Sequence, residues 1–108
     1  MVLVVATVLF PHAKSNQVAK KNIELIQKYP ADPSLGKQLV IGLQATLEGI
    51  KAIVVNEVAK GKIEEYIERA AKQYQETALE IEGYKYQIET FMTVPEAYKI
   101  LGMEPPTE

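Results

Sequence analysis

Few side chains of this sequence could carry out catalysis or bind a metal. The chain of 108 residues has no cysteine and a single histidine, His12. The absence of cysteine excludes disulfides, thiolate metal ligands and thiol nucleophiles. His12 follows the first predicted strand and could act there as a general base or an axial ligand. We interpret it instead as a solvent-exposed loop residue beside Pro11. We expect no metal site, because one histidine without a flanking acidic cluster cannot supply the usual ligand set.

Four polar residues form a second candidate site: Gln44, Lys85, Gln87 and Glu89. They lie in two segments that we predict to be β-strands, at positions that would share one face of a sheet. Buried together in a cavity, they could orient a small ligand and shift one another's pKa values. The alternative, which we favour, is that they pair across an interface between two copies of the chain or contact water. Neither interpretation requires a cofactor.

Composition and charge indicate one globular domain over residues 1–108. Hydrophobic residues make up 47% of the chain and charged residues 24%, a balance that argues against disorder. The net charge is −2 and Arg69 is the only arginine, so we expect no nucleic-acid partner. The apolar opening, MVLVVATVLF, is too short to span a bilayer and lacks the features of a signal peptide. We therefore expect a cytoplasmic protein without a membrane partner.

The spacing of apolar residues predicts the helices and strands before residue 30 and after residue 62. The first predicted strand is apolar on both faces, which is typical of a central strand in a covered sheet. The helix after it places Leu25 beside Ile23 and Ile26 on one apolar face. In chain order the predictions are a strand at 3–10, a helix at 15–29, a helix at 63–82, a strand at 84–92, a short capped helix at about 94–101 and a tail at 102–108.

The segment from Gly42 to Lys62 fits two structures. Its apolar residues recur at helical spacing, yet residues 53–55 are a β-branched run and Gly49 lies where a hairpin would turn. A helix would hold Gly42 and Gly49 in its interior, at a cost of roughly 1 kcal/mol each. It would also leave a sheet of only two strands, which is marginal. We therefore predict a β-hairpin at residues 38–58.

The resulting order is β-α-β-β-α-β, an α+β fold with a four-stranded antiparallel sheet. Right-handed crossovers place both helices on one face of the sheet and give the strand order 4-1-3-2. The opposite face, which we call the open face, has no element to cover it. Alternation assigns the following residues to the helix side: Leu39, Ile41, Leu43, Ala45, Tyr84, Tyr86 and Ile88. It assigns these to the open face: Leu3, Val5, Thr7, Leu9, Val40, Gln44, Thr46, Lys85, Gln87, Glu89 and Phe91. The third strand adds either Lys51, Ile53, Val55 and Glu57 or the alternate set with Asn56.

This order, together with the segment GIKAIVVNEVAKGKIEE from Gly49 to Glu65, resembles the dimeric α+β-barrel proteins. These are a ferredoxin-like group in which two sheets pack face to face. The resemblance covers Leu3 to Leu101 and implies a homodimer that encloses a small cavity between two open faces. The group includes cofactor-free oxygenases, haem-binding enzymes, amino-acid-sensing regulators and domains without known activity, so the fold does not select an activity.

The residues present cannot be assembled into a nucleophile–base pair, a phosphate loop or a metal cluster. We therefore predict that the chain acts in non-catalytic small-molecule binding or in protein interaction. The alternative is a cofactor-independent, oxygenase-like enzyme that acts on a small apolar metabolite in the dimer cavity. That enzyme would need His12 or the Gln87–Glu89 edge to border the cavity, as proton acceptor and hydrogen-bond donor respectively.

Overall fold

The structure of the chain is a computed structural model that describes residues 1–106. Its elements are β1 (Val2–Phe10), a 3-10 turn η1 (His12–Lys14), α1 (Ser15–Lys28), β2 (Gly36–Ala45), β3 (Ile50–Val58), α2 (Ile63–Glu80), β4 (Lys85–Met92) and α3 (Val94–Ile100). Thr107 and Glu108, the end of the predicted tail, lie outside the described residues.

Residues 36–58 form a β-hairpin, so the prediction of a hairpin in place of a helix is confirmed. β2 pairs antiparallel with β3 along its length. Gly49, in the turn, has a φ of +151°, which residues with a side chain rarely adopt. A Cβ atom at this position would lie 2.2 Å from the carbonyl oxygen of Phe10. Glycine is therefore required both by the turn and by the close approach of the end of β1.

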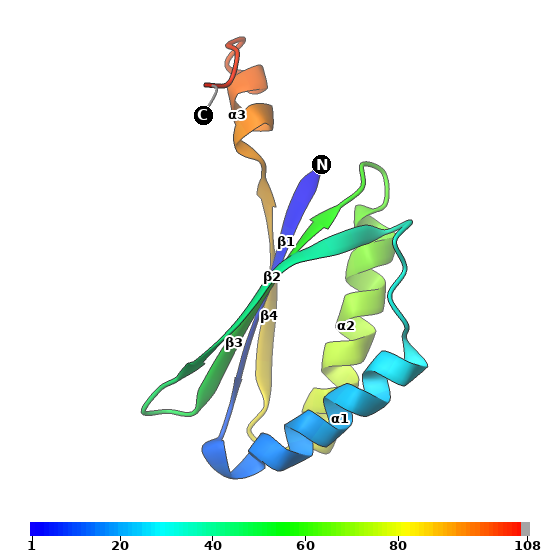
Figure 1. The fold of residues 1–108 in the computed structure, drawn as a ribbon, viewed down its shortest axis with the longest axis vertical. Coiled ribbons are helices and arrows are strands. Elements are labelled where there is room, and N and C mark those ends of the chain that lie inside the picture. The colour runs from blue at the N-terminus through cyan, green and yellow to red at the C-terminus, as the bar shows by residue number, and fades with distance from the viewer. Residues whose placement is uncertain (107–108) are drawn as a thin grey trace.

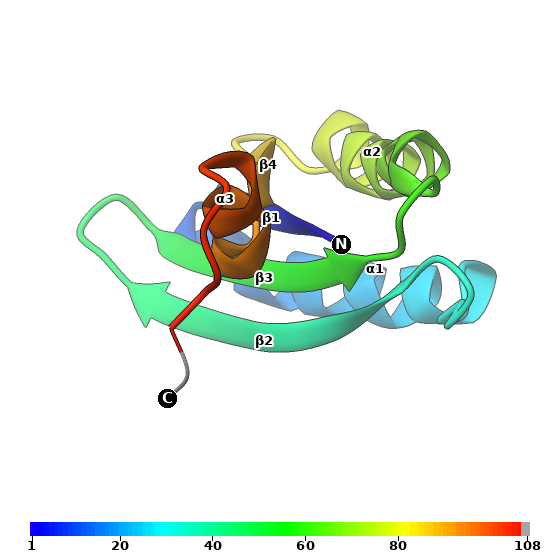
Figure 2. The ribbon, with the colours of Figure 1, turned by 90° about the horizontal axis from the view of Figure 1, so that it is seen from above.

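The four strands form one antiparallel sheet in the order β2-β3-β1-β4, which reads β4-β1-β3-β2 from the other edge. β1 and β3 are the central strands, as their apolar composition predicts. Figure 1 shows the sheet nearly edge-on, with α1 and α2 on one side and no other described helix packed on the opposite side. The view from above shows the same two layers (Figure 2). The open face is thus uncovered in the single chain.

The core lies between the helix side of the sheet and the two long helices. Its buried apolar residues are Val4, Ala6, Val8, Phe10, Leu25, Leu35, Ala52, Val58 and Ile81. Two aromatic pairs extend this core. Tyr74 of α2 stacks on Tyr86 of β4 with ring centroids 5.6 Å apart, and Phe10 stacks on Tyr84 at 6.3 Å. The pairs tie β4 to α2 and the residue before β4 to the end of β1.

The face that α1 turns to the core differs from the prediction. Leu25 is only 7% exposed, as expected, but Ile23 and Ile26 are 60% and 61% exposed. Lys21 occupies a core-facing position and is 7% exposed. Its ammonium forms ion pairs with carboxylates of α2, which compensate the burial of the charge. The predicted face was wrong because these pairs join two helices that are distant in sequence.

β2 is an edge strand that is exposed on both of its faces. Ile41 and Leu43 point to the helix side as predicted, since they pair with Val54 and Ala52. No helix covers them, however: their side chains are 58% and 74% exposed. A bulge after Gln38 interrupts the pairing with β3, and the twist of the sheet turns the hairpin end away from α1 (Figure 1).

α3 projects beyond the end of β4, away from α1 and α2 (Figure 1). Thr93 caps it: its hydroxyl oxygen accepts a hydrogen bond from the Glu96 amide at 3.3 Å. The N-terminal ammonium of Met1 lies 3.3 Å from a carboxylate oxygen of Glu96. Val94 and Ile100 are 61% and 72% exposed, so the apolar side of this helix is uncovered.

In the part of the chain that the structure describes, no helix is both long enough and apolar enough to cross a bilayer.

Candidate functional site

The open face presents its side chains in four rows across β3, β1 and β4. The register of β1 with its two neighbours defines the rows. Starting from the hairpin end they are Lys51-Leu9-Lys85, Ile53-Thr7-Gln87, Val55-Val5-Glu89 and Glu57-Leu3-Phe91. β2 adds Gln44, Gly42 and Val40 to the first three rows. β3 therefore contributes the set that begins with Lys51, the first of the two alternatives.

Apolar side chains extend across the open face from β2 to β4 and reach solvent. Val40, Ile53 and Phe91 are 53%, 39% and 48% exposed. Val5 and Val55, which are cross-strand neighbours, lie between them and are half-buried. A contiguous apolar patch of this kind on a monomer indicates an interaction surface.

Three of the four predicted polar residues line up along β4. The side-chain amide of Gln87 donates a hydrogen bond of 2.8 Å to a carboxylate oxygen of Glu89. Lys85 is two positions before Gln87 on the same strand, and all three side chains are exposed. Thr7 is the neighbour of Gln87 on β1. The β4 edge of the open face is therefore a polar strip beside an apolar floor.

Gln44 does not join this strip within one chain. It lies on β2, where it pairs with Lys51 of β3. β2 and β4 are the two opposite edges of the sheet. Three strand spacings separate them, which is about 14 Å. Gln44 and Glu89 could thus face the same ligand only in an assembly that folds two open faces together.

His12 lies at the end of β1, in the turn η1, and is tied to the neighbouring hairpin. Its Nε2 atom is 2.8 Å from the carbonyl oxygen of Thr46. Because a carbonyl can only accept a hydrogen bond, Nε2 carries a proton and donates it. The ring is exposed, as expected for a loop histidine. This nitrogen is therefore engaged in a structural contact and is not free to accept a proton or to bind a metal.

The hairpin turn at Thr46 is a feature that the sequence reading missed. The Thr46 hydroxyl donates to the carbonyl oxygen of Gly49 at 2.7 Å and accepts from the amides of Glu48 and Gly49 at 3.2 and 3.1 Å. A Ser or Thr that precedes a glycine turn is a weak signal for such a bond. With His12 bound to the same residue, the turn is anchored to the end of β1.

Among residues 1–106, no three His, Cys, Asp or Glu side chains lie close enough together to bind a metal ion.

Comparisons of the chain with models of protein families, with curated proteins and with solved structures found no match. The function must therefore be inferred from the geometry of the chain itself.

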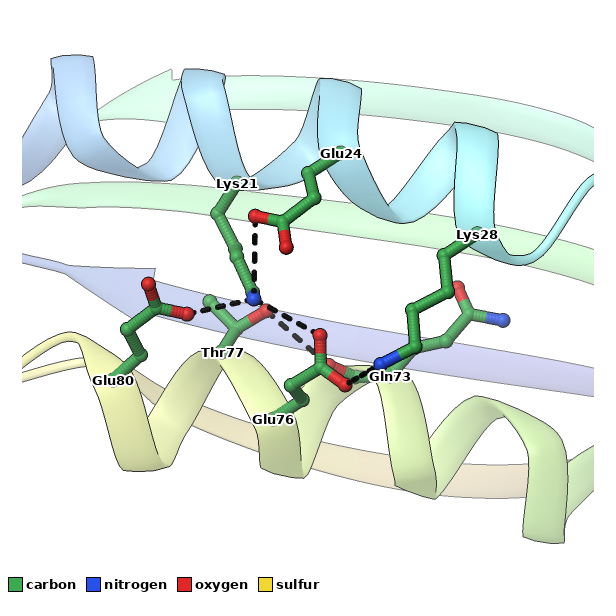
Figure 3. Close-up of polar contacts among 7 residues, drawn as sticks. All are labelled: Lys21, Glu24, Lys28, Gln73, Glu76, Thr77 and Glu80. Atoms are coloured by element: carbon green, nitrogen blue, oxygen red, sulfur yellow. Dashed lines mark hydrogen bonds and ion pairs between the residues drawn. The ribbon is translucent and has the colours of Figure 1, made fainter.

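An ion-pair cluster between α1 and α2 is the other feature that sequence reasoning missed (Figure 3). The ammonium of Lys21 lies 2.6 Å from Glu80, 2.9 Å from Glu76 and 3.4 Å from Glu24. Lys28 reaches the other oxygen of Glu76 at 2.7 Å. A lysine within the Val18–Leu25 stripe was the one signal that could have revealed the cluster. These pairs hold the two helices together.

The charges of this cluster stabilise one another's ionised forms. Hydrogen bonds to Glu80 and Glu76 raise the pKa of Lys21 above the usual lysine value. The ammonium groups of Lys28 and Lys21 lower the pKa of Glu76 below its usual 4.5. Lys21, Lys28 and Glu76 are therefore charged near neutral pH, and none of the three is held in the unusual protonation state that acid–base catalysis uses.

A cleft of about 620 Å³ lies between the end of α1 and the first half of α2. Its wall includes Arg69, whose guanidinium donates to the carbonyl oxygen of Pro30 and lies 3.6 Å from Asp32. Hydrogen bonds from the hydroxyl and amide of Ser34 lower the pKa of Asp32. Arg69 and Asp32 thus already have partners, and they fasten the loop after α1 to α2.

Proposed function

We propose that the chain is a non-catalytic binding domain of ferredoxin-like fold that works as a homodimer, with two open faces packed together as a dimeric α+β barrel. The order of elements, the antiparallel sheet and the position of both long helices on one side support the fold. A cytoplasmic location is part of the proposal, and the absence of cysteine supports it.

The uncovered apolar floor of the open face is the observation that carries this proposal. Val40, Ile53 and Phe91 reach solvent on a sheet whose other side is packed against helices. Four strands about 4.8 Å apart, each with eight residues of about 3.4 Å, give a flat face of roughly 500 Å². Two such faces would bury about 1,000 Å², the size from which specific interfaces become stable. We therefore expect a dimer that dissociates on dilution.

The polar strip of β4 is where a small ligand would bind in that dimer. Gln87 and Glu89 already form a hydrogen-bonded pair beside Thr7. The exposed Lys85 lies on the same strand as this pair, whereas Gln44, on the opposite edge of the sheet, would line the far rim of the interface. A polar group of this kind on an apolar floor is the pattern of a site that orients a small, mostly apolar molecule.

The same pair favours a second candidate function, a cofactor-independent, oxygenase-like enzyme for a small apolar metabolite. Glu89 would then act on a substrate that supplies most of the reactivity. We assign no role in this site to His12, since it lies beyond the end of β1 and its Nε2 is bound to Thr46. We prefer the non-catalytic function because the amine of Lys85 is the one other acid or base beside the pair on β4, and the remaining charged residues of the open face in the described chain lie on β3 and β2.

Light scattering after gel filtration tests the dimer. The wild type should give twice 12.0 kDa at high micromolar concentration and a lower mass on dilution. Ile53→Lys, in the middle of the open face, should give the monomer with an unchanged far-ultraviolet circular dichroism spectrum. Ile26→Lys is the matched control on the outer side of α1 and should remain dimeric. A wild type that is monomeric at every concentration would refute the proposal.

Native mass spectrometry of the purified dimer separates the two functions. A retained small molecule that is lost in Gln87→Ala would support the binding site. Turnover of such a molecule by the wild type, abolished in Glu89→Gln, would replace the non-catalytic function by the enzymatic one.

A further inference from the structure

The charged residues of the open face are segregated along the strands. Lys51 and Lys85 flank Leu9 in the row at the hairpin end. Glu57 and Glu89 lie in the two rows at the opposite end. Within residues 1–106 none of these four side chains takes part in an ion pair. The face therefore has a positive end and a negative end.

The charges on β3 cannot satisfy each other within one chain. Lys51 and Glu57 are six positions apart on the same strand, a separation of about 20 Å. Lys37 of β2 lies opposite Glu57 and brings one positive charge to the end that holds Glu57 and Glu89, but no ion pair joins Lys37 to Glu57 among the described residues. Residues 1–106 thus supply no ion-pair partner for Lys51.

A two-fold axis can pack the open faces of two copies against each other in two arrangements. If the strands of the two sheets run the same way, the lysines of both copies meet at one end and the glutamates at the other, which is unfavourable. If they run in opposite directions, the positive end of each copy covers the negative end of the other. The contact is then self-complementary, as a closed two-fold interface requires.

We infer that the partner of the open face is a second copy of this chain in the antiparallel orientation, with Lys51 of each copy facing Glu57 of the other. This inference rests on the proposed homodimer and adds its register. With the axis between the second and third rows, Ile53 meets Val55 of the other copy and Leu9 meets Leu3. Gln87 meets Glu89 in the same way, so each copy completes the polar strip of the other. Lys37 then faces the uncharged Gln44.

Charge reversal with complementation tests the register. Lys51→Glu alone and Glu57→Lys alone each create two like-charge contacts per dimer, so each should raise the dimer Kd about tenfold or more. Mixed in equal amounts, the two variants should form a heterodimer with a Kd close to that of the wild type, because each contact is again between opposite charges. Lys20→Glu, an exposed residue of α1, is the control and should leave the wild-type Kd unchanged.

The outcomes distinguish the register from the dimer itself. If the wild type dimerises, Ile53→Lys abolishes the dimer and the mixture of charge variants does not recover it, the antiparallel register is wrong and the homodimer stands. If the wild type is monomeric, the proposed function and this inference both fail. Recovery in the mixture but not in either variant alone would establish that residues 51 and 57 meet across the axis.

Discussion

The Nε2 atom of His12 and the carbonyl oxygen of Thr46 lie 2.8 Å apart, although the two residues are 34 positions apart in the chain. The contact joins the turn after β1 to the turn of the β2–β3 hairpin. Gly49 reinforces the junction, because its Cα lies against the carbonyl of Phe10. The only histidine of the chain thus serves to fix one end of the sheet.

Replacing His12 should loosen this end of the sheet. His12→Ala removes one hydrogen bond from a partly solvated site, so the free energy of unfolding should fall by about 1 kcal/mol in urea denaturation. Amide hydrogen exchange at Glu48 and Gly49 should become faster, while exchange in α2 should not change. Equal protection of the turn in the variant and the wild type would show that the contact has no structural role.

Adding a methyl group at Gly49 should be far more harmful than adding one at Gly42. Gly49→Ala combines a φ of +151° with a Cβ placed 2.2 Å from a carbonyl oxygen, and we expect a loss of about 2 kcal/mol or more. At Gly42 the nearest atom to a new Cβ is a side-chain carbon of Ile53 at 3.7 Å, an ordinary contact. Gly42→Ala should therefore stay within about 0.5 kcal/mol of the wild type. Similar denaturation midpoints for the two variants would contradict the turn geometry.

Adjacent residues of α1 test which face of the helix is buried. Leu25→Ala empties a site that is 7% exposed and should lower the free energy of unfolding by about 3 kcal/mol. Ile26→Ala removes a side chain that is 61% exposed and should change it by less than about 0.5 kcal/mol. Thermal unfolding at low concentration would measure both. Comparable losses in the two variants would restore the face that periodicity predicts, because that face buries both residues.

Acid should remove the contribution of the ion-pair cluster between α1 and α2 to the free energy of unfolding. The pKa of Glu76 is below 4.5 in the folded chain, so its contribution to stability is fully present above pH 4.5 and is lost as the pH falls through the lowered pKa. Glu76→Gln should thus be less stable than the wild type at pH 7, and the difference should vanish in strong acid. Glu64→Gln, at an exposed position of α2, is the control and should stay within about 0.5 kcal/mol of the wild type at pH 7. The pKa of Lys21 is raised, so its contribution should persist to a pH above 10.5.

Local signals were sufficient for most of the elements and for the alternation along the strands. Gly49 and the β-branched run of β3 predicted the hairpin, because both act within a few residues of where they stand. The rows of the open face follow from the two-residue period of a strand once the central strands are known. The separation of Gln44 from Glu89 was already implied by the predicted strand order, which puts β2 and β4 at opposite edges.

Features that depend on distant partners were not predictable in the same way. The burial of Lys21 depends on Glu76 and Glu80 of α2, and its place within the Val18–Leu25 stripe is the one local signal of it. The exposure of Ile41 and Leu43 depends on how far the twisted sheet carries β2 from α1. The bond from His12 to Thr46 likewise needs the hairpin and the end of β1 to be in place.

The topology of the sheet also determines when it can form during synthesis. β1 is made first, yet it is a central strand whose partners are β3 and β4. Phe10 pairs with Ile50, and Leu9 pairs with Lys85. At ribosomal rates of about 5–20 residues per second, the apolar β1 waits roughly 2–8 s for its first partner and about twice as long for its second. The most apolar strand of the nascent chain is therefore the one that stays unpaired longest, and a ribosome stalled before Lys85 would leave one side of it without a partner.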